Sequence, residues 1–412
     1  ITPLREKLLI RPLLGLYEKV LPAMSDTERD ALEAGTMWWE AELFSGQPDW
    51  HHLLAYPQAG LSDEERAFLE GPAETLCGMI DDWEITEELR DLTPETWAYM
   101  KEQGFFGMII PREYGGLEFS ANAHSQVVMK LASVSISAGV TVMVPNSLGP
   151  AKLLLAYGTP EQKHHYLPRL AKGTDIPCFA LTGPEAGSDA AAMPDTGIIC
   201  RQDFNGERDV LGIRLNWEKR YITLGPVATL LGLAFHLYDP DHLAGDEEDV
   251  GITLALIPTD TPGVEIGRRH FPMNQSFMNG PNRGRDVFIP MYWVIGGQAQ
   301  LGNGWRMLMN CLSDGRAISL PALSVAAGKK MARAVGAYAG VRKQFRVPIG
   351  KFEGVSEVLA RIAAKACIMN AARSLTCAAL DNGEEPSVAS AILKYHTTEY
   401  MRDVVNDGMD IL

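Results

Sequence analysis

The sequence predicts an α+β protein with an N-terminal helical domain, a middle antiparallel β-barrel domain and a C-terminal helix bundle that is incomplete at its end. This prediction rests on two changes in the hydrophobic periodicity along the chain. Up to Ile176, apolar residues recur with the period of amphipathic helices, whereas beyond it short apolar or alternating runs are separated by Gly, Pro and Asp. From Gly302 the helical period returns. The predicted divisions are an N-terminal extension over residues 1–60, the N-terminal domain over 61–176, the middle domain over 177–297 and the C-terminal domain over 298–412.

The first helix of the N-terminal domain is expected to begin after Ser62. A serine followed three residues later by Glu65 forms the sequence signature of a capping box, in which each side chain binds the other residue's backbone N–H. Helical character continues through residues 92–105 and again from Ala121 to Ala138. Between them the run EYGGLEFS, residues 113–120, is expected to turn.

The middle section holds about eight runs of strand character and ends near Pro290. Residues 209–215 (DVLGIRL) and 219–225 (KRYITLG) are counted here as two separate strands. In the C-terminal domain, one helix is expected after Gly302, and two more from Gly350 to Leu380 and from Ser387 to the end.

Residues 1–25 are both basic and apolar, and two interpretations stay open. Their leucines fall on a rough helical stripe with Arg and Lys around it, which is typical of a helix that lies on a membrane surface. The alternative is an extension that packs on its own protein. Pro12 interrupts the helical pattern and favours this second interpretation.

Composition excludes several classes of function. The chain has 412 residues and a formal net charge of −15, which argues against a nucleic-acid partner. Its six cysteines form no CxxC pair and its nine histidines show no metal spacing, so reduced thiols in a cytoplasmic protein and no metal site are expected. No run reaches the roughly 18 apolar residues of a membrane span. Because the chain begins with Ile1 and ends at Leu412 without a polar tail, a piece of a longer polypeptide is expected. The expected location is the cytoplasm, and peripheral contact to the inner membrane through residues 1–25 stays open.

One loop and one strand end are the strongest candidates for a binding site. The apolar run Ile176–Thr182 opens into the small-residue loop GPEAGSD, residues 183–189, where backbone N–H groups can approach an anion closely. About thirty residues later, Tyr221-Ile222-Thr223 repeats the pairing of an aromatic residue with a hydroxyl at a strand end. Taken alone, the threonines could be ordinary strand residues and the loop an ordinary turn.

In this order and spacing the motifs resemble the acyl-CoA dehydrogenase flavoprotein family, from about residue 62 to the end of the chain. The long N-terminal extension makes the chain most similar to the large bacterial fatty-acyl-CoA dehydrogenases of the FadE type. The segments that carry the resemblance are PNSLG at 145–149, YGTPEQ at 157–162, the GSD loop, YIT, GNGW at 302–305 and RKQF at 342–345.

The resemblance implies an FAD site. It places the hydroxyls of Thr182 and Thr223 on the flavin ring, with Tyr221 beside the ring where the family usually has Trp. It places Gly187 and Ser188 at the FAD diphosphate, with Ser188 also on the CoA side. Gly183 and Glu185 depart from the family pattern in this loop.

The family's second FAD contact comes from a neighbouring subunit. Here the matching residues are Arg342, Gln344 and Phe345, and a guanidinium suits a phosphate through paired N–H donors. The resemblance therefore implies a homo-oligomer, a dimer or a tetramer. It also implies that Ser313 and Arg316 lie at the substrate site. Without the resemblance, a basic patch on a helix would be interpreted as a solvated face.

The resemblance implies FAD-dependent oxidation of a fatty acyl-CoA to the trans-2-enoyl-CoA, the first step of β-oxidation, with electrons passed to an electron-transfer flavoprotein. Some family members carry the catalytic base where this chain has Gly315, which cannot accept a proton. Others carry a Glu in a segment that would follow Leu412, so no catalytic base is expected within these residues. Asp407 and Asp410 are interpreted as helix-surface or packing groups. The alternatives are an acyl-CoA oxidase that uses O₂ and a non-catalytic scaffold on the same fold.

Overall fold

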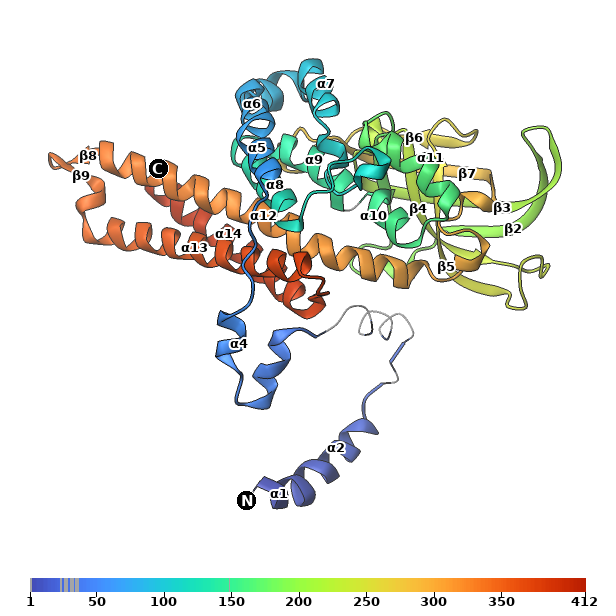
Figure 1. Ribbon diagram of the computed structural model, residues 1–412, viewed down its shortest axis with the longest axis horizontal. Coiled ribbons are helices and arrows are strands. Elements are labelled where there is room, and N and C mark those ends of the chain that lie inside the picture. The colour runs from blue at the N-terminus through green and yellow to red at the C-terminus, as the bar shows by residue number, and fades with distance from the viewer. Residues whose placement is uncertain (1, 23, 26–28, 30–32, 34–36, 148) are drawn as a thin grey trace.

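The computed structural model describes residues 2–22, 24–25, 29, 33, 37–147 and 149–412, without the side chains of residues 2, 3, 313 and 314. Helices come first, a β-sheet follows, and long helices close the chain, which confirms the predicted order (Figure 1). In the figure the sheet lies at one end of the molecule and the tip of the C-terminal helices at the other. The predicted divisions after residues 60, 176 and 297 fall between elements and stay predictions.

The N-terminal domain is helical, and its first helix is capped as predicted. The Ser62 hydroxyl accepts from the Glu65 N–H at 3.2 Å, and the Glu65 carboxylate accepts from the Ser62 N–H at 2.8 Å. The same carboxylate also accepts from the Ser120 N–H at 2.7 Å, which ties the first helix to the start of α8. The helices are α5 (Asp63–Glu70), α6 (Pro72–Met79), α7 (Pro94–Glu102), α8 (Ala121–Val134), α9 (Ile136–Ser147), α10 (Pro150–Tyr157) and α11 (Pro160–Ala171).

The middle domain is a seven-stranded sheet rather than eight strands. The expectation of separate strands at 209–215 and 219–225 is wrong, because β3 runs unbroken through both. Most pairs are antiparallel, as predicted, but β1 and β2 both run parallel to β4 on the side opposite β5. The strands are β1 (Pro177–Ala180), β2 (Thr196–Phe204), β3 (Glu207–Thr223), β4 (Leu230–Tyr238), β5 (Asp249–Pro258), β6 (Val264–Ile266) and β7 (Asn279–Pro290).

One glutamine joins the helical domain to the segment that follows the sheet. Thr159 and Gln162 form a capping box at the start of α11. The Gln162 amide then donates to the backbone oxygens of Tyr292 and Val294, at 3.0 and 2.6 Å, and accepts from the Gly296 N–H at 3.0 Å. This explains why the motif TPEQ stands at that position, since its last residue serves both the helix cap and the domain contact.

The C-terminal domain consists of three long helices and a small hairpin, in agreement with the prediction. Helix α12 (Gly304–Val341) leads into the hairpin β8 (Lys343–Gln344) and β9 (Val347–Pro348), and α13 (Glu353–Asp381) and α14 (Ser387–Ile411) follow. Figure 1 shows the hairpin at the tip of this domain, at the end farthest from the sheet. Among the described residues, no helix is both long and apolar enough to span a bilayer.

The N-terminal extension divides into two parts. Helices α1 (Thr2–Arg5), η1 (Glu6–Ile10) and α2 (Arg11–Glu18) form one run, in which Pro12 lies in the first turn of α2 and needs no backbone donor. Residues 4–22 are exposed except for Gly15, so the expectation that this stretch packs on its own protein is wrong. The second part, η2 (Trp39–Ser45) and α4 (Trp50–Leu54), lies beside α13 and α14 and shares an apolar pocket with them.

Candidate active site

A cavity of about 220 Å³ lies where β1 and β3 end. We call it the strand-end cavity. It brings together Thr182, Tyr221 and Thr223, three of the residues that the resemblance assigns to FAD. The remaining wall is mostly apolar, and it comes from α9, α10, β1 and α12. Its other lining residues are Val144, Ser147, Gly149, Leu153, Phe179, Leu181, Ile222, Leu308, Cys311 and Leu312.

A buried ion pair holds the two strand ends together. The Lys219 side chain is fully buried, and its ammonium group donates to the Asp195 carboxylate and to the Leu181 carbonyl, the latter at 2.8 Å. Burial lowers the pKa of Lys219, and Asp195 counters that shift. Asp195 also accepts from the Glu218 N–H at 2.8 Å. The backbone just before Thr182 is therefore tied to β3 by Lys219 and Asp195, which lie outside the cavity.

A bulge in β3 sets the orientation of Tyr221. The β3–β7 register shifts between Lys219 and Ile222, and Tyr221 has a φ of +59°, a conformation that non-glycine residues rarely adopt. The Asn279 amide donates to the Tyr221 carbonyl at 3.0 Å and to the Thr223 hydroxyl at 3.3 Å. Because that hydroxyl accepts from Asn279, its own hydrogen remains available for another acceptor. The Tyr221 ring is 57% exposed and packs on His270, with ring centroids 4.6 Å apart.

The GPEAGSD loop follows directly from the strand-end cavity. The N–H of Gly183 donates to the Ala186 carbonyl at 2.9 Å, and a Cβ at Gly183 would lie 2.9 Å from the Glu218 oxygen. Gly183, where the family has Glu, therefore lets the loop backbone lie directly against β3. Gly187 and Ser188 are exposed, and an added Cβ at Gly187 would meet no atom within 4 Å. The end of the loop is open to a ligand.

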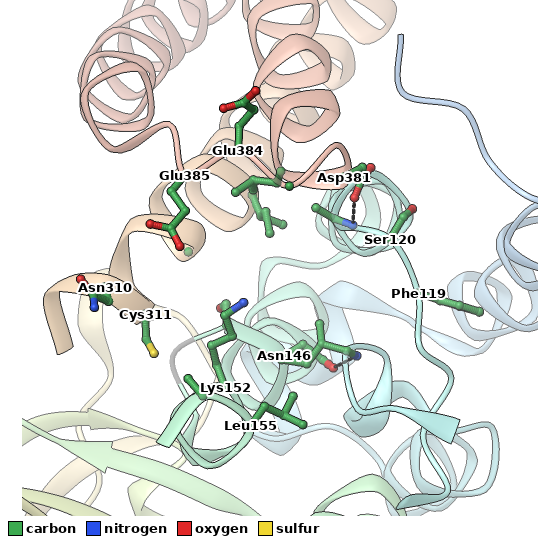
Figure 2. Close-up of a pocket in the computed structure, with 18 of the residues that line it drawn as sticks. Phe119, Ser120, Asn146, Lys152, Leu155, Asn310, Cys311, Asp381, Glu384 and Glu385 are labelled. Atoms are coloured by element: carbon green, nitrogen blue, oxygen red, sulfur yellow. Dashed lines mark hydrogen bonds between the residues drawn. The ribbon is translucent and has the colours of Figure 1, made fainter. Parts of the chain in front are cut away.

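A second cavity of about 500 Å³ adjoins the first, and we call it the interhelical cavity. It lies between α8, α10, α12 and the turn that joins α13 to α14, and Figure 2 shows Lys152 and Leu155 facing Glu384 and Glu385 across it. Ser147 and Cys311 line both cavities. The two cavities therefore share part of their walls.

The PNSLG motif forms part of this second wall. The Asn146 amide donates to the Phe105 carbonyl at 2.7 Å and accepts from the Ile109 N–H at 3.3 Å, so it anchors the segment FFGMI. Leu148 of the motif lies outside the described residues. Asn146, in the last turn of α9, thus has a structural role that the motif alone did not reveal.

Three acidic residues around the interhelical cavity were missed at the level of sequence. Asp381, Glu384 and Glu385 come from the end of α13 and the following turn. Asp381 accepts from the N–H groups of Ala121 and Asn122, at 2.6 and 3.2 Å, and burial nevertheless raises its pKa. It therefore serves the start of α8. No local pattern marks this turn, because only the packing of α13 against α8 brings it to the cavity.

The substrate residues implied by the resemblance lie on α12. Gly315 is buried and lines the interhelical cavity, and it offers no side chain that could accept a proton. Arg316 is half-buried and lines neither cavity. The side chain of Ser313 lies outside the described part of the chain. The structure thus brings Gly315, rather than Arg316, to the cavity wall.

Asp407 and Asp410 lie away from both cavities. The Asp407 carboxylate accepts two hydrogen bonds from the Arg361 guanidinium, at 2.8 and 2.7 Å, and this pairing lowers its pKa. Asp410 is exposed. Both therefore agree with the interpretation as surface or packing groups of the last helix.

Arg342, Gln344 and Phe345 do not join the other candidate residues within one chain. They lie in the hairpin at the tip of the C-terminal domain, and all three are exposed. The Phe345 side chain is 91% exposed. Within a single chain, the two halves of the implied FAD site are separated by the length of the C-terminal helices (Figure 1).

The residues around the strand-end cavity fit an isoalloxazine ring. The ring is flat and largely apolar with a polar edge, and the cavity offers apolar walls with two threonine hydroxyls. Thr182 donates to the Arg220 carbonyl at 3.3 Å, so its oxygen keeps lone pairs for a donor, whereas Thr223 keeps a hydrogen for an acceptor. The open end of the GSD loop beside them can accept the phosphates.

Comparison with known sequences identifies three regions of one family. Residues 61–174 match the N-terminal domain of acyl-CoA dehydrogenases, residues 178–279 the middle domain, and residues 302–412 the C-terminal domain. The chain is 30% identical to the probable acyl-CoA dehydrogenase FadE10 of Mycobacterium tuberculosis over 89% of its own length. It spans only 54% of FadE10, about half of that relative.

Two further relatives cover most of both chains. A 3-(aryl)acrylate reductase of Clostridium sporogenes is 30% identical over 84% of this chain and 85% of its own. The structure of butyryl-CoA dehydrogenase from Megasphaera elsdenii superposes with a TM-score of 0.73 at 23% identity, covering 86% of this chain and 89% of that one. The chain therefore belongs to the acyl-CoA dehydrogenase family, whose members are FAD flavoproteins.

Proposed function

We propose that the protein oxidises fatty acyl-CoA thioesters to trans-2-enoyl-CoA with bound FAD, as the first step of β-oxidation, and passes the electrons to an electron-transfer flavoprotein. One observation carries the proposal. The strand-end cavity combines apolar walls with the hydroxyls of Thr182 and Thr223, and it shares walls with a larger cavity that can take an acyl group. The family supports the cofactor and the reaction type.

In this reaction a base removes the α-proton of the thioester and the β-hydrogen leaves as hydride. FAD supplies the hydride acceptor, which no amino-acid side chain can replace. Thr182 and Thr223 would orient the ring through hydrogen bonds, and Tyr221 would pack beside it. Gly187 and Ser188 would approach the diphosphate, with Ser188 also near the CoA. Ser313 and Arg316 are proposed for the substrate on the resemblance alone.

The proposal assigns the base to no residue of the strand-end cavity. Among its lining residues with described side chains, none carries a carboxylate. A base must lie within hydrogen-bond reach of the proton that it removes. Glu384 and Glu385, which line the neighbouring interhelical cavity, are the candidate bases among the described residues.

A second candidate function is reduction of a carbon–carbon double bond. One of the relatives that cover most of both chains is named for reducing 3-(aryl)acrylates. The same arrangement of flavin and substrate allows hydride transfer from the β-carbon to the flavin or from the flavin to the β-carbon. Arylacrylate and its CoA thioester are therefore the comparison substrates for palmitoyl-CoA.

The test begins with FAD. Protein purified with excess FAD is passed through gel filtration, and its absorbance near 450 nm is measured for wild type, Thr223→Val and Thr398→Val. Thr398 is half-buried on α14 and lies outside both cavities, and it is the matched control. Thr223→Val should weaken FAD binding by up to roughly tenfold, since one hydrogen bond contributes about 0.5–1.5 kcal/mol. A wild-type protein that retains no flavin would instead support the scaffold alternative.

The flavoprotein is then mixed with palmitoyl-CoA. Loss of the flavin absorbance on adding palmitoyl-CoA supports the proposal. If palmitoyl-CoA leaves the spectrum unchanged but chemically reduced flavin is reoxidised by an arylacrylate or its CoA thioester, the second candidate is favoured. Turnover with ferrocenium should be slow, because general-base catalysis contributes about 10²–10⁴-fold. Full turnover would mean that a carboxylate within this chain acts as the base, and Glu384→Gln and Glu385→Gln would be the next variants. Rapid reoxidation by O₂ in stopped flow would identify an oxidase.

A further inference from the structure

The exposed run of residues 2–21, here called the N-terminal arm, is an unusual surface for this protein. It forms consecutive helical segments from Thr2 to Glu18, and none of the side chains in η1 or α2 is buried. Leu13 is 61% exposed, Tyr17 67% and Val20 76%. Figure 1 shows the arm extending away from the helices and the sheet. Its apolar side chains therefore lie against nothing in the described chain.

The arm has two distinct faces. Leu9, Leu13, Leu16, Tyr17 and Val20 are spaced i, i+4, i+7, i+8 and i+11, which places them along one side of a helix. Ile10, Leu14 and Leu21 widen the same side. Lys7, Arg11, Glu18 and Lys19 lie on the other side, together with Leu4 and Leu8, whereas Arg5 borders the apolar side and Glu6 falls within it near the start of the arm.

The charge of the arm is opposite to that of the chain. Residues 2–21 carry four basic and two acidic side chains, whereas the whole chain has a net charge of −15. Of the basic residues, Arg11 pairs with Glu6 at 3.1 Å, in a pair that is exposed on both sides. An apolar side bordered by Lys and Arg is the pattern of helices that lie in the plane of a bilayer surface. The positive charge selects an anionic surface.

We propose that the N-terminal arm is an interfacial helix that binds anionic lipid bilayers. The side formed by Leu9, Leu13, Leu16, Tyr17 and Val20 enters the boundary of the acyl chains, and Arg11 and Lys19 remain at the headgroups. The acidic remainder of the protein is repelled by the same surface, so the arm alone makes the contact. Pro12 is compatible with this role, because it lies in the first turn of α2.

The test is flotation of the 412-residue chain with vesicles of phosphatidylcholine alone and of phosphatidylcholine with 30% phosphatidylglycerol. Leu13→Glu tests the apolar side, and Arg11→Glu/Lys19→Glu tests the charge. Met273→Glu is the matched control, because Met273 is 92% exposed on the middle domain. All these positions are exposed, so circular dichroism and the melting temperature should be unchanged.

Wild type and Met273→Glu should float with the anionic vesicles, and 0.5 M salt should weaken that binding. Leu13→Glu should lower the bound fraction at least tenfold, and the charge-reversed variant should lose its preference for phosphatidylglycerol. Failure of wild type to bind, or equal binding by Leu13→Glu, would overturn the proposal. The proposal would also be overturned if Leu13→Glu had a lower mass in solution than wild type and neither protein bound vesicles, because the arm would then join two copies of the chain. Flavin content does not enter this measurement, so its outcome is independent of the proposed activity.

Discussion

Lys219 is the residue on which the geometry of the candidate site depends most directly. It is a fully buried cation in a strand whose neighbours on the same face are apolar, and it has the Asp195 carboxylate and the Leu181 carbonyl as acceptors. Removing one partner of such a pair leaves the other charge buried and unpaired, which commonly destabilises a protein by about 3–5 kcal/mol. Replacing both partners by apolar residues costs much less.

We therefore expect Lys219→Met to lower the free energy of unfolding by about 3–5 kcal/mol and to reduce flavin retention, because the Leu181–Thr182 backbone loses its anchor. The double variant Lys219→Met/Asp195→Leu should recover a large part of that stability. Urea denaturation of the two variants beside wild type measures both effects. Lys172→Met, at an exposed lysine, is the control and should be neutral. A single variant as stable as wild type would mean that the pair contributes nothing to the site.

At the scale of elements, Glu65 connects two helices through its two carboxylate oxygens. One accepts from the Ser62 N–H within its own cap, and the other accepts from the Ser120 N–H at the start of α8. Burial by itself would raise the pKa of Glu65, but these hydrogen bonds outweigh it and lower the pKa. A carboxyl whose folded pKa is lowered contributes stability above its unfolded pKa, and that contribution is lost as the pH falls through the folded value.

The corresponding variant is Glu65→Gln, which keeps one acceptor and loses the charge. At pH 7 it should be less stable than wild type by about 1–2 kcal/mol. As the pH falls below about 4.3, the unfolded value of a Glu, the two proteins should converge, because wild type also loses the charge. Guanidinium titrations at pH 7, 5 and 3.5 test this. A difference that stays constant over this range would show that the charge has no part in joining α5 to α8.

The elements that the sequence predicted best are those with local signatures. The capping boxes at Ser62 and Thr159 and the long periodic helices after Gly302 depend only on neighbouring residues. The division of β3 was wrong for a physical reason. Along residues 215–219 the side chains alternate regularly between buried and exposed, but the last inward position holds Lys219. The predicted break fell at residues 216–218, where Asn216 and Glu218 are exposed and Trp217 is buried, so the alternation continues through it. The charged run from Glu218 to Arg220 hides this continuity until Asp195, the buried partner of Lys219, is known.

At the scale of the whole molecule, the candidate site was predictable in part. Thr182, Tyr221 and Thr223 were expected together and line one cavity. Asn279 and Asp195, which hold these segments, carry no motif of their own. Glu384 and Glu385 reach the second cavity only through the packing of α13 against α8. Sequence patterns report local periods, whereas these residues act across distances that only the folded chain establishes.

The hairpin at the tip of the C-terminal domain is the feature that one chain alone does not explain. Phe345 and Arg346 have φ values of +51° and +65°, in a two-residue turn that usually holds Gly or Asn. A left-handed conformation costs roughly 1–2 kcal/mol per ordinary residue, and here it presents an almost fully exposed phenylalanine. Arg342 lies beside it, with its guanidinium 5.7 Å from the Tyr338 ring. These observations favour a binding partner for the hairpin.

On the resemblance we propose the FAD of a neighbouring subunit as that partner, and under this proposal one substitution should affect two properties together. Arg342→Ala should weaken FAD binding roughly tenfold or more, because a hydrogen bond to a charged group contributes about 1.5–3 kcal/mol. It should also shift the oligomer toward smaller species whenever FAD is limiting. Lys343→Ala removes the adjacent exposed cation and is the matched control. Flavin absorbance and light-scattering mass are measured across one gel-filtration peak. If Arg342→Ala keeps both the wild-type flavin content and the wild-type mass, the hairpin does not reach a neighbour's cofactor.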